Sequence, residues 1–330
     1  MLPRRAIWML LRVGITLVFA AYVASKIDVS ILSQRLVSIT GAWLLMALGV
    51  VAVQIGLVSA RWACVIAALH GRIGFRRCLR YAWEGQFFGQ VLPSSVGGDV
   101  VRIFRIHRAG LPAGAAAATV LLDRLAALAV VFLSVGFSFP VLAEMVKIPG
   151  FVVGMGTVLI LGVLGFAFLF AMDRLLKLPR SWQLTRFLHR LAVESRALIL
   201  RPNMAAVVVG YSFLILFLSA LTLFLLGKSL DIGLGFTRSL VFTPLIMLLM
   251  TLPISIAGWG IREISMVVLL EDVGIAPIDA VALSVAFGLA LLITALPGGV
   301  LWAFDSQSKH TPESGPDKRL SRWDSHNDAK

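Results

Sequence analysis

Long apolar runs separated by short basic segments organise this 330-residue chain. A helix needs roughly 20 apolar residues to cross a bilayer, and several runs reach that length. We expect spans at residues 6–24, 42–69, 112–140, 151–172, 204–226 and 280–304. The pattern predicts an all-α fold, a polytopic membrane helix bundle of about six to eight spans with two broken or re-entrant segments.

The first broken segment is residues 92–102, L-P-S-S-V-G-G-D-V-V-R. Pro93 lacks a backbone N–H, and the pair Gly97–Gly98 lets the chain turn. Basic residues lie on both sides of the short apolar run 82–92, so we interpret residues 82–98 as a re-entrant hairpin or half-helix entering from the cytoplasm. The alternative is an ordinary cytoplasmic loop.

The second broken segment, residues 252–262, superposes on the first after a shift of 160 positions. Paired Gly/Pro-interrupted segments in two halves indicate the binding site of a transporter. Eight arginines fall within residues 61–110, whereas residues 228–277 are slightly acidic. This opposite charge predicts an inverted repeat of residues 42–140 and 202–304. In the alternative, residues 240–257 cross the membrane fully.

Charge and the chain ends give the expected topology. The formal net charge is +13, and 14% of the residues are charged. The cations gather between apolar runs, as the positive-inside rule of membrane proteins predicts, and this distribution argues against nucleic-acid binding. We expect one transmembrane domain, residues 1–304, with both termini cytoplasmic and a disordered cytoplasmic tail at 305–330. The basic segment 174–201 is interpreted as a surface helix on the anionic membrane or, equally, as a solvated linker.

Two adjacent charges lie deep in the predicted span 112–140. Asp123 and Arg124 are about 16 Å along a helix that begins at Pro112, where an unpaired charge is expensive. Neighbours in sequence do not face each other on a helix, so we expect Arg102 to pair with Asp123 and Asp99 with Arg124. The alternative is a structural salt bridge with no role in transport.

The sequence resembles the membrane region of the lysylphosphatidylglycerol synthase/flippase family. The carrying residues are Gln86 to Pro93, Gly97–Gly98–Asp99 with Arg102, Leu122 to Leu125, Gly258 to Glu263, and Leu296 to Gly299. We expect Pro297–Gly298–Gly299 to break the last span. The resemblance covers nearly all of residues 5–305 and implies lipid translocation in the bacterial inner membrane. Only a short polar tail follows Phe304, so transfer of lysine to lipid is not expected.

The leading hypothesis is a flippase- or scramblase-like transporter of a phospholipid or a lipid-linked headgroup, without an enzymatic activity, a cofactor or a metal. Its predicted path is formed by Ser94, Ser95, Gly97, Gly98, Asp99, Arg102, Asp123, Arg124, Ser255, Gly258, Arg262 and Glu263. Arg102 and Arg262 are the expected phosphate contacts, because a guanidinium binds two oxygens at once.

Two alternatives come from other classes. The first is a polyprenyl-phosphate-dependent membrane transferase, with Glu84, Asp99 or Asp123 as a general base. The second is a scaffold for cell-envelope assembly. The sequence leaves open whether the chain forms a homo-oligomer.

Overall fold

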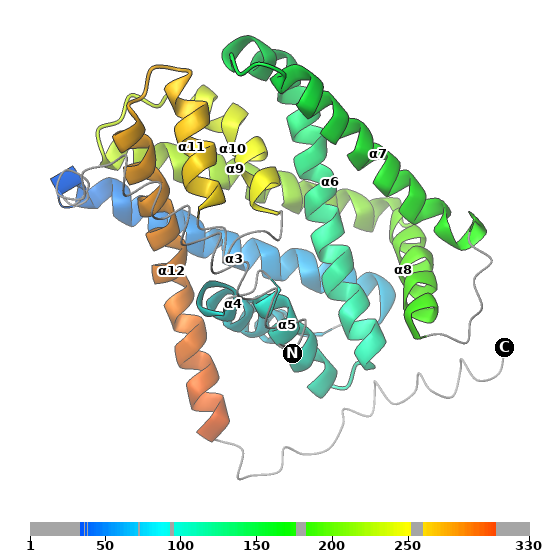
Figure 1. Ribbon diagram of the computed structural model, residues 1–330. Coiled ribbons are helices and arrows are strands. Elements are labelled where there is room, and N and C mark those ends of the chain that lie inside the picture. Colours follow the sequence, from blue (N-terminus) through cyan, green and yellow to red (C-terminus); the bar gives the residue numbers. More distant parts are fainter. Residues whose placement is uncertain are drawn as a thin grey trace, which may run out of the picture.

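The chain forms a bundle of helices (Figure 1). The computed structural model describes residues 34–35, 37, 39–71, 73–92, 96–175, 183–251 and 260–307. The helices are α3 (Gly41–Leu69), α4 (Phe75–Val91), α5 (Gly97–Arg108), α6 (Ala113–Met145), α7 (Phe151–Leu175), α8 (Gln183–Ile199), α9 (Pro202–Ser229), α10 (Phe236–Met250), α11 (Ile261–Glu271) and α12 (Pro277–Gln307). The predicted all-α class is confirmed.

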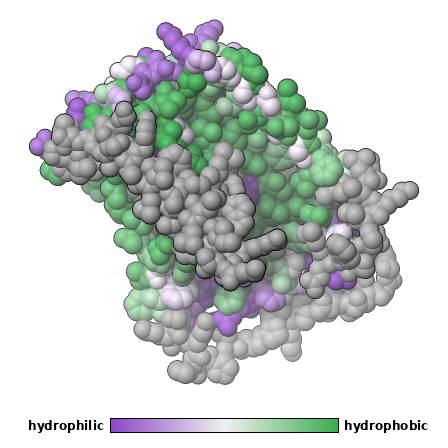
Figure 2. All heavy atoms as spheres, viewed as in Figure 1, coloured by the Kyte–Doolittle hydropathy of each residue, from purple (hydrophilic) through white to green (hydrophobic). Residues whose placement is uncertain are grey.

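Five of the described helices, namely α3, α6, α7, α9 and α12, are long and apolar enough to cross a membrane. They match five of the six predicted spans, and the sixth, residues 6–24, lies outside the described residues. Figure 2 shows a broad hydrophobic band with hydrophilic residues gathered at two opposite ends of the molecule. Large apolar side chains such as Phe137 of α6 and Val153 of α7 are exposed, as lipid-facing residues should be.

α3 and α9 pack side by side as a central pair, and the other long helices lie around them (Figure 1). In the view of Figure 1, the α4–α5 hairpin lies on one side of α3 and the α10–α11 hairpin on the other. α12 packs against members of both hairpins, α4 and α11. The largest buried core joins apolar residues of α9, α10, α11 and α12, including Leu226, Phe242, Leu270 and Leu283.

The α4–α5 hairpin starts and finishes at the same end of the bundle. α4 begins shortly after α3 ends, and α5 ends shortly before α6 begins. Those two ends are neighbours, because Trp62 Nε1 of α3 donates to Thr119 Oγ1 of α6 at 3.4 Å. The hairpin therefore returns to the side from which it enters, as predicted for residues 82–98.

The α10–α11 hairpin enters from the opposite end. Arg238 Nη1 in the first turn of α10 lies 3.5 Å from the carbonyl oxygen of Val273, just past α11. Beside it, the backbone N–H of Lys147 after α6 donates to Asp272 Oδ2 at 3.0 Å. The second segment thus turns back rather than crossing. Hairpins entering from opposite ends are the geometry that an inverted repeat requires, while the repeat boundaries stay a prediction.

The predicted break at Pro297 is wrong. α12 continues through it to Gln307, and Gly298 serves close packing instead. A Cβ at Gly298 would lie 2.1 Å from the carbonyl oxygen of Trp83 on α4. The indole of Trp83 donates to the carbonyl of Thr294, three residues before the proline, at 2.8 Å, which is a second contact between α4 and α12.

The predicted tail also begins too early. Asp305 belongs to α12 and forms ion pairs with Arg80 of α4 and Arg105 of α5. These pairs hold the last turns of the helix against the first hairpin. The remainder of the predicted tail, residues 308–330, lies outside the described residues.

The basic segment 174–201 contains α8, which packs its apolar face into the bundle. Leu191, Ala192 and Leu198 are buried against α3, α6, α7 and α9, and Glu194 lies 3.3 Å from His70 at the end of α3. Arg186 and Arg190 of this helix are exposed, although the guanidinium of Arg190 also lies against Gly114 of α6. Contact of these arginines with anionic lipid stays a prediction.

Labelling of single cysteines tests the topology. We expect Arg108→Cys to react with a membrane-impermeant thiol reagent only from the cytoplasm and Glu271→Cys only from outside, because both sites are exposed and lie at opposite ends of the bundle. Arg105 is a poor site because it is buried. The native Cys64 and Cys78 are replaced by serine in the background chain. Labelling of both sites from one face contradicts the topology.

Candidate functional site

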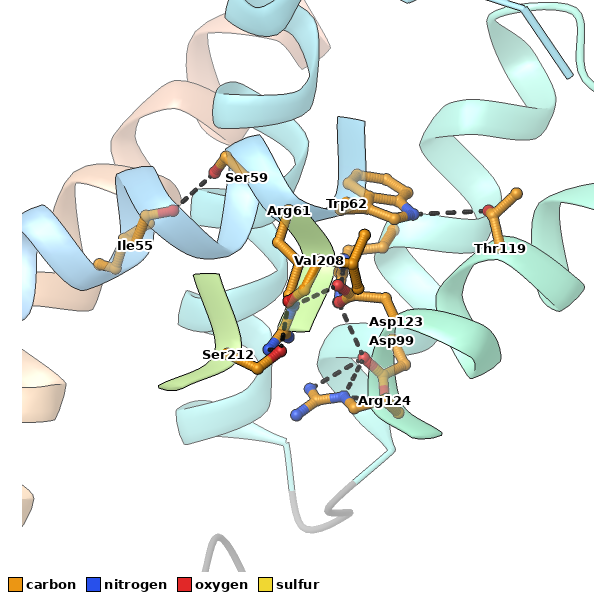
Figure 3. A network of polar contacts seen from close by, with 11 residues as sticks. Ile55, Ser59, Arg61, Trp62, Asp99, Thr119, Asp123, Arg124, Val208 and Ser212 are labelled. Atoms are coloured by element: carbon orange, nitrogen blue, oxygen red, sulfur yellow. Dashed lines mark hydrogen bonds and ion pairs between the residues drawn. The ribbon is translucent and has the colours of Figure 1, made fainter. Parts of the chain in front are cut away.

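Five charged residues meet where α3, α5 and α6 pack together (Figure 3). We call this group the arginine–aspartate cluster: Arg61 from α3, Asp99 and Arg102 from α5, and Asp123 and Arg124 from α6. Two of these helices, α3 and α6, are long and apolar, and a charge inside such a helix needs a partner.

Asp123 is the centre of the cluster and is completely buried. Its Oδ1 accepts from Arg61 Nε at 2.8 Å, and its Oδ2 accepts from Arg102 Nη2 at 2.9 Å. Arg61 also donates from Nη1 to Ser212 Oγ of α9 at 3.0 Å. A single carboxylate thus joins α3, α5 and α6, with α9 attached through the serine. Charge-assisted hydrogen bonds of this kind are the strong ones.

Arg102 is held by packing as well as by charge. Its Cζ lies 4.2 Å from the ring centroid of Trp62, within the range of a cation–π interaction. Its aliphatic stem lies against Gly85, where an added Cβ would be 2.9 Å from Cγ. The Nε of Arg102 is buried and has no hydrogen-bond acceptor among the described residues.

Gly98 lets the two helices of the hairpin approach closely enough to place α5. A Cβ at Gly98 would lie 2.2 Å from the carbonyl oxygen of Gly85 and 3.0 Å from its carbonyl carbon. No real Cβ can come that near to backbone, so only glycine fits. This contact fixes the position of α5 and therefore the positions from which Asp99 and Arg102, later in the same helix, face α6.

Arg124 is the exposed member of the cluster. Its Nε and Nη2 donate to Asp99 at 2.9 to 3.1 Å, yet the side chain is 58% exposed while that of Asp99 is 16% exposed. Arg124 lies about 16 Å from the start of α6, inside a predicted span. An exposed guanidinium at this depth is expensive in lipid, so it must meet water or a polar headgroup.

The predicted pairs Arg102–Asp123 and Asp99–Arg124 are both confirmed. Gly97 and Gly98 open α5 beside them. The remaining predicted path residues of the two broken segments, Ser94, Ser95, Ser255 and Gly258, lie outside the described residues.

Arg262 and Glu263 form a separate group at the start of α11. Arg262 Nη2 donates to Glu263 Oε1 at 2.9 Å, and Ser284 Oγ of α12 donates to the same oxygen at 2.8 Å. The contact between Arg262 and Glu263 lies at the start of α11. There Gly260 has a φ of +93°, and its N–H donates to Glu263 Oε2 at 2.5 Å. The guanidinium is 1% exposed and packs on Gly288, so its place on a path stays a prediction.

Two parts of the charge arrangement were missed by the sequence reasoning. Arg61 was given no partner, although it lies inside the predicted span 42–69, where a charge requires one. Glu84 accepts from Arg80 Nε at 3.1 Å and from Arg105 Nε at 2.5 Å. Because both of its oxygens are engaged and it is 0% exposed, Glu84 is poorly placed to act as a general base. No three His, Cys, Asp or Glu side chains in the described ranges could hold a metal ion.

A comparison with known protein families shows to which family the chain belongs. The family described as the lysylphosphatidylglycerol synthase TM region matches residues 9–299. The chain belongs to this family. It is therefore a multi-pass membrane protein of that family, as the five apolar helices independently indicate. No curated protein matches the chain.

Proposed function

We propose that this protein moves a phospholipid or a lipid-linked headgroup between the leaflets of the bacterial inner membrane. The observation that carries the proposal is Arg124, a guanidinium 58% exposed at about 16 Å along α6 and held by Asp99. A headgroup crossing the roughly 30 Å hydrocarbon core needs polar partners on the way. Arg124 offers one inside a span.

The other residues of the cluster suit this role because they hold the helices together while the side chain of Arg124 stays exposed. Asp123 is shared between Arg61 and Arg102 and stays buried, so these three hold α3, α5 and α6 together. Arg124 donates from Nε to Asp99 Oδ2 at 3.0 Å and from Nη2 to Asp99 Oδ1 at 2.9 Å, the two-pronged geometry in which a guanidinium also binds two phosphate oxygens. An arriving phosphate can therefore replace Asp99 on Arg124. Arg102, the phosphate contact expected from the sequence, stays buried and supports the site through its ion pair with Asp123.

The opposed hairpins supply a route for such a headgroup. α4–α5 carries part of the cluster from one end of the bundle, and α10–α11 enters from the other. Movement of one hairpin against the long helices would expose the cluster to one leaflet and then to the other. This is the alternating access expected of paired broken segments.

Reconstituted vesicles test the proposed function. We expect fluorescent-headgroup phospholipids in the inner leaflet to become accessible to an impermeant quencher faster in vesicles with protein than in protein-free vesicles. Anionic, zwitterionic and lipid-linked sugar substrates are compared in separate preparations. Equal rates with and without protein for every substrate contradict the proposal.

A further inference from the structure

Four charged side chains form a closed ring where the last turns of α12 lie against the α4–α5 hairpin. Glu84 accepts from Arg80 at 3.1 Å and from Arg105 at 2.5 Å. Asp305 accepts from the same two arginines, at 2.8 Å from Arg80. Each carboxylate oxygen of the ring therefore has one guanidinium partner, and two cations balance two anions.

The ring joins the two predicted halves of the protein. Arg80 and Glu84 lie on α4 and Arg105 on α5, so the pairs of Glu84 stay within the hairpin. Asp305 alone comes from α12, the last helix of the predicted second half, and both of its pairs cross the seam between α4 and α12. If Asp305 moves away, Glu84 still pairs with both arginines. Release therefore avoids the large cost of leaving a buried charge without a partner.

The two attachments of the hairpin differ in how far solvent reaches them. Asp123, which ties α5 to α6, has a side chain that is 1% exposed, whereas the side chains of Asp305 and Arg80 are 22% and 38% exposed. Water and salt weaken ion pairs that they reach. Along the same seam, Gly298 and Gly299 of α12 pack closely on α4 without side chains that could interlock with it. The hairpin is thus held firmly to α6 and releasably to α12.

We infer that the ring is a latch at the predicted cytoplasmic end, closed in this structure, and that its opening separates α12 from α4 while the hairpin stays on α6. Asp305 is the part that leaves, because its two pairs are the ones that cross the seam. The inference rests on the proposed function, because it names the seam that opens when the two halves move against each other.

A reversible link across the seam tests whether the latch must open during lipid movement. Arg80→Cys and Asp305→Cys are combined in the chain without native cysteines and joined by a short, reducible bis-methanethiosulfonate linker. We expect the link to slow protein-dependent lipid movement in vesicles about tenfold or more, and reduction to restore the rate. Leu301→Cys with Asp305→Cys, one turn apart on α12, is the matched control and should move lipid equally fast linked and unlinked. Undiminished movement with the seam linked overturns the inference.

Opening of the seam is also measured without transport. The reporter is Thr294→Cys, at a buried position of α12 whose carbonyl accepts from Trp83 of α4. Asp305→Asn should raise the rate at which this cysteine reacts with N-ethylmaleimide in detergent about tenfold, whereas Arg76→Gln, an exposed arginine of α4 outside the ring, should not change it. Thr222→Cys, buried between α9 and α3, should react equally slowly with and without Asp305→Asn. An unchanged rate at Thr294→Cys, or an equal rise at both reporters, overturns the latch.

Failure of the latch is distinct from failure of the proposed function. Lipid movement that continues at full rate across the linked seam overturns only the latch. Faster reaction of Thr294→Cys in Asp305→Asn, without lipid movement by the unlinked protein, overturns only the transport role.

Discussion

Asp123→Asn is expected to destabilise the protein by about 3–5 kcal/mol, the effect of breaking a buried ion pair by removing one partner. Asp123 is the shared carboxylate of Arg61 and Arg102, which are 4% exposed each. Without its charge, both guanidinium groups stay buried beside a neutral amide. The midpoint of thermal unfolding in detergent should fall strongly, and expression should fall with it.

The matched control for this change is Asp231→Asn. Asp231 is exposed, and its φ of +54° is one that asparagine adopts as readily as aspartate. We expect this variant to unfold at the wild-type temperature. If Asp123→Asn is equally neutral, Asp123 does not carry the charge pairing described above.

The double-mutant cycle of Arg102→Gln and Asp123→Asn should give a coupling energy clearly different from zero. A charge swap, Asp123→Arg with Arg102→Asp, is expected to recover little. The reason is Arg61, whose Nε lies 2.8 Å from the carboxylate that the swap would replace with a second guanidinium. Full recovery by the swap would show that Arg61 contributes nothing to the pairing.

Gly98→Ala is expected to cost about 1–3 kcal/mol or more, the range for overpacking. The new Cβ would lie 2.2 Å from the carbonyl oxygen of Gly85, and backbone cannot give way as a flexible side chain can. The α4–α5 hairpin must open, which moves Asp99 and Arg102 away from α6. Both thermal stability and lipid binding should therefore fall.

Gly89→Ala lies on the same hairpin and is the control. Its Cβ would meet the Cα of Gly98 at 3.9 Å, an ordinary contact, and alanine favours the helix by up to about 1 kcal/mol. This variant should be as stable as wild type or slightly more so. Equal tolerance of alanine at Gly98 and Gly89 would contradict the close packing of the hairpin.

The spans and the cluster pairs could be predicted because single strong effects control them. The length of the apolar runs was enough to predict the membrane-spanning helices α3, α6, α7, α9 and α12. The cost of an unpaired charge in a span, with the motif Asp99 to Arg102 nearby, was enough to pair Arg102 with Asp123 and Asp99 with Arg124.

The remaining features depend on partners far away in the sequence. Pro297 looks like a helix breaker, yet α12 continues through it and packs on α4, where Trp83 donates to the carbonyl of Thr294. Arg61 is 62 residues from Asp123, and no local pattern joins the two. Asp305 looked like the start of a polar tail until Arg80 and Arg105 were found beside it. Each outcome is decided by tertiary packing rather than by local sequence.

The central claim, that a headgroup passes by the exposed member of the cluster, is tested most directly by the rate of inter-leaflet lipid movement in vesicles containing Arg124→Gln. Arg108→Gln serves as the control, reconstituted at equal density. We predict that Arg124→Gln slows movement of an anionic phospholipid about tenfold or more while its thermal unfolding stays close to wild type, because Arg124 is exposed. The control should keep the wild-type rate. Wild-type movement with Arg124→Gln would contradict the account.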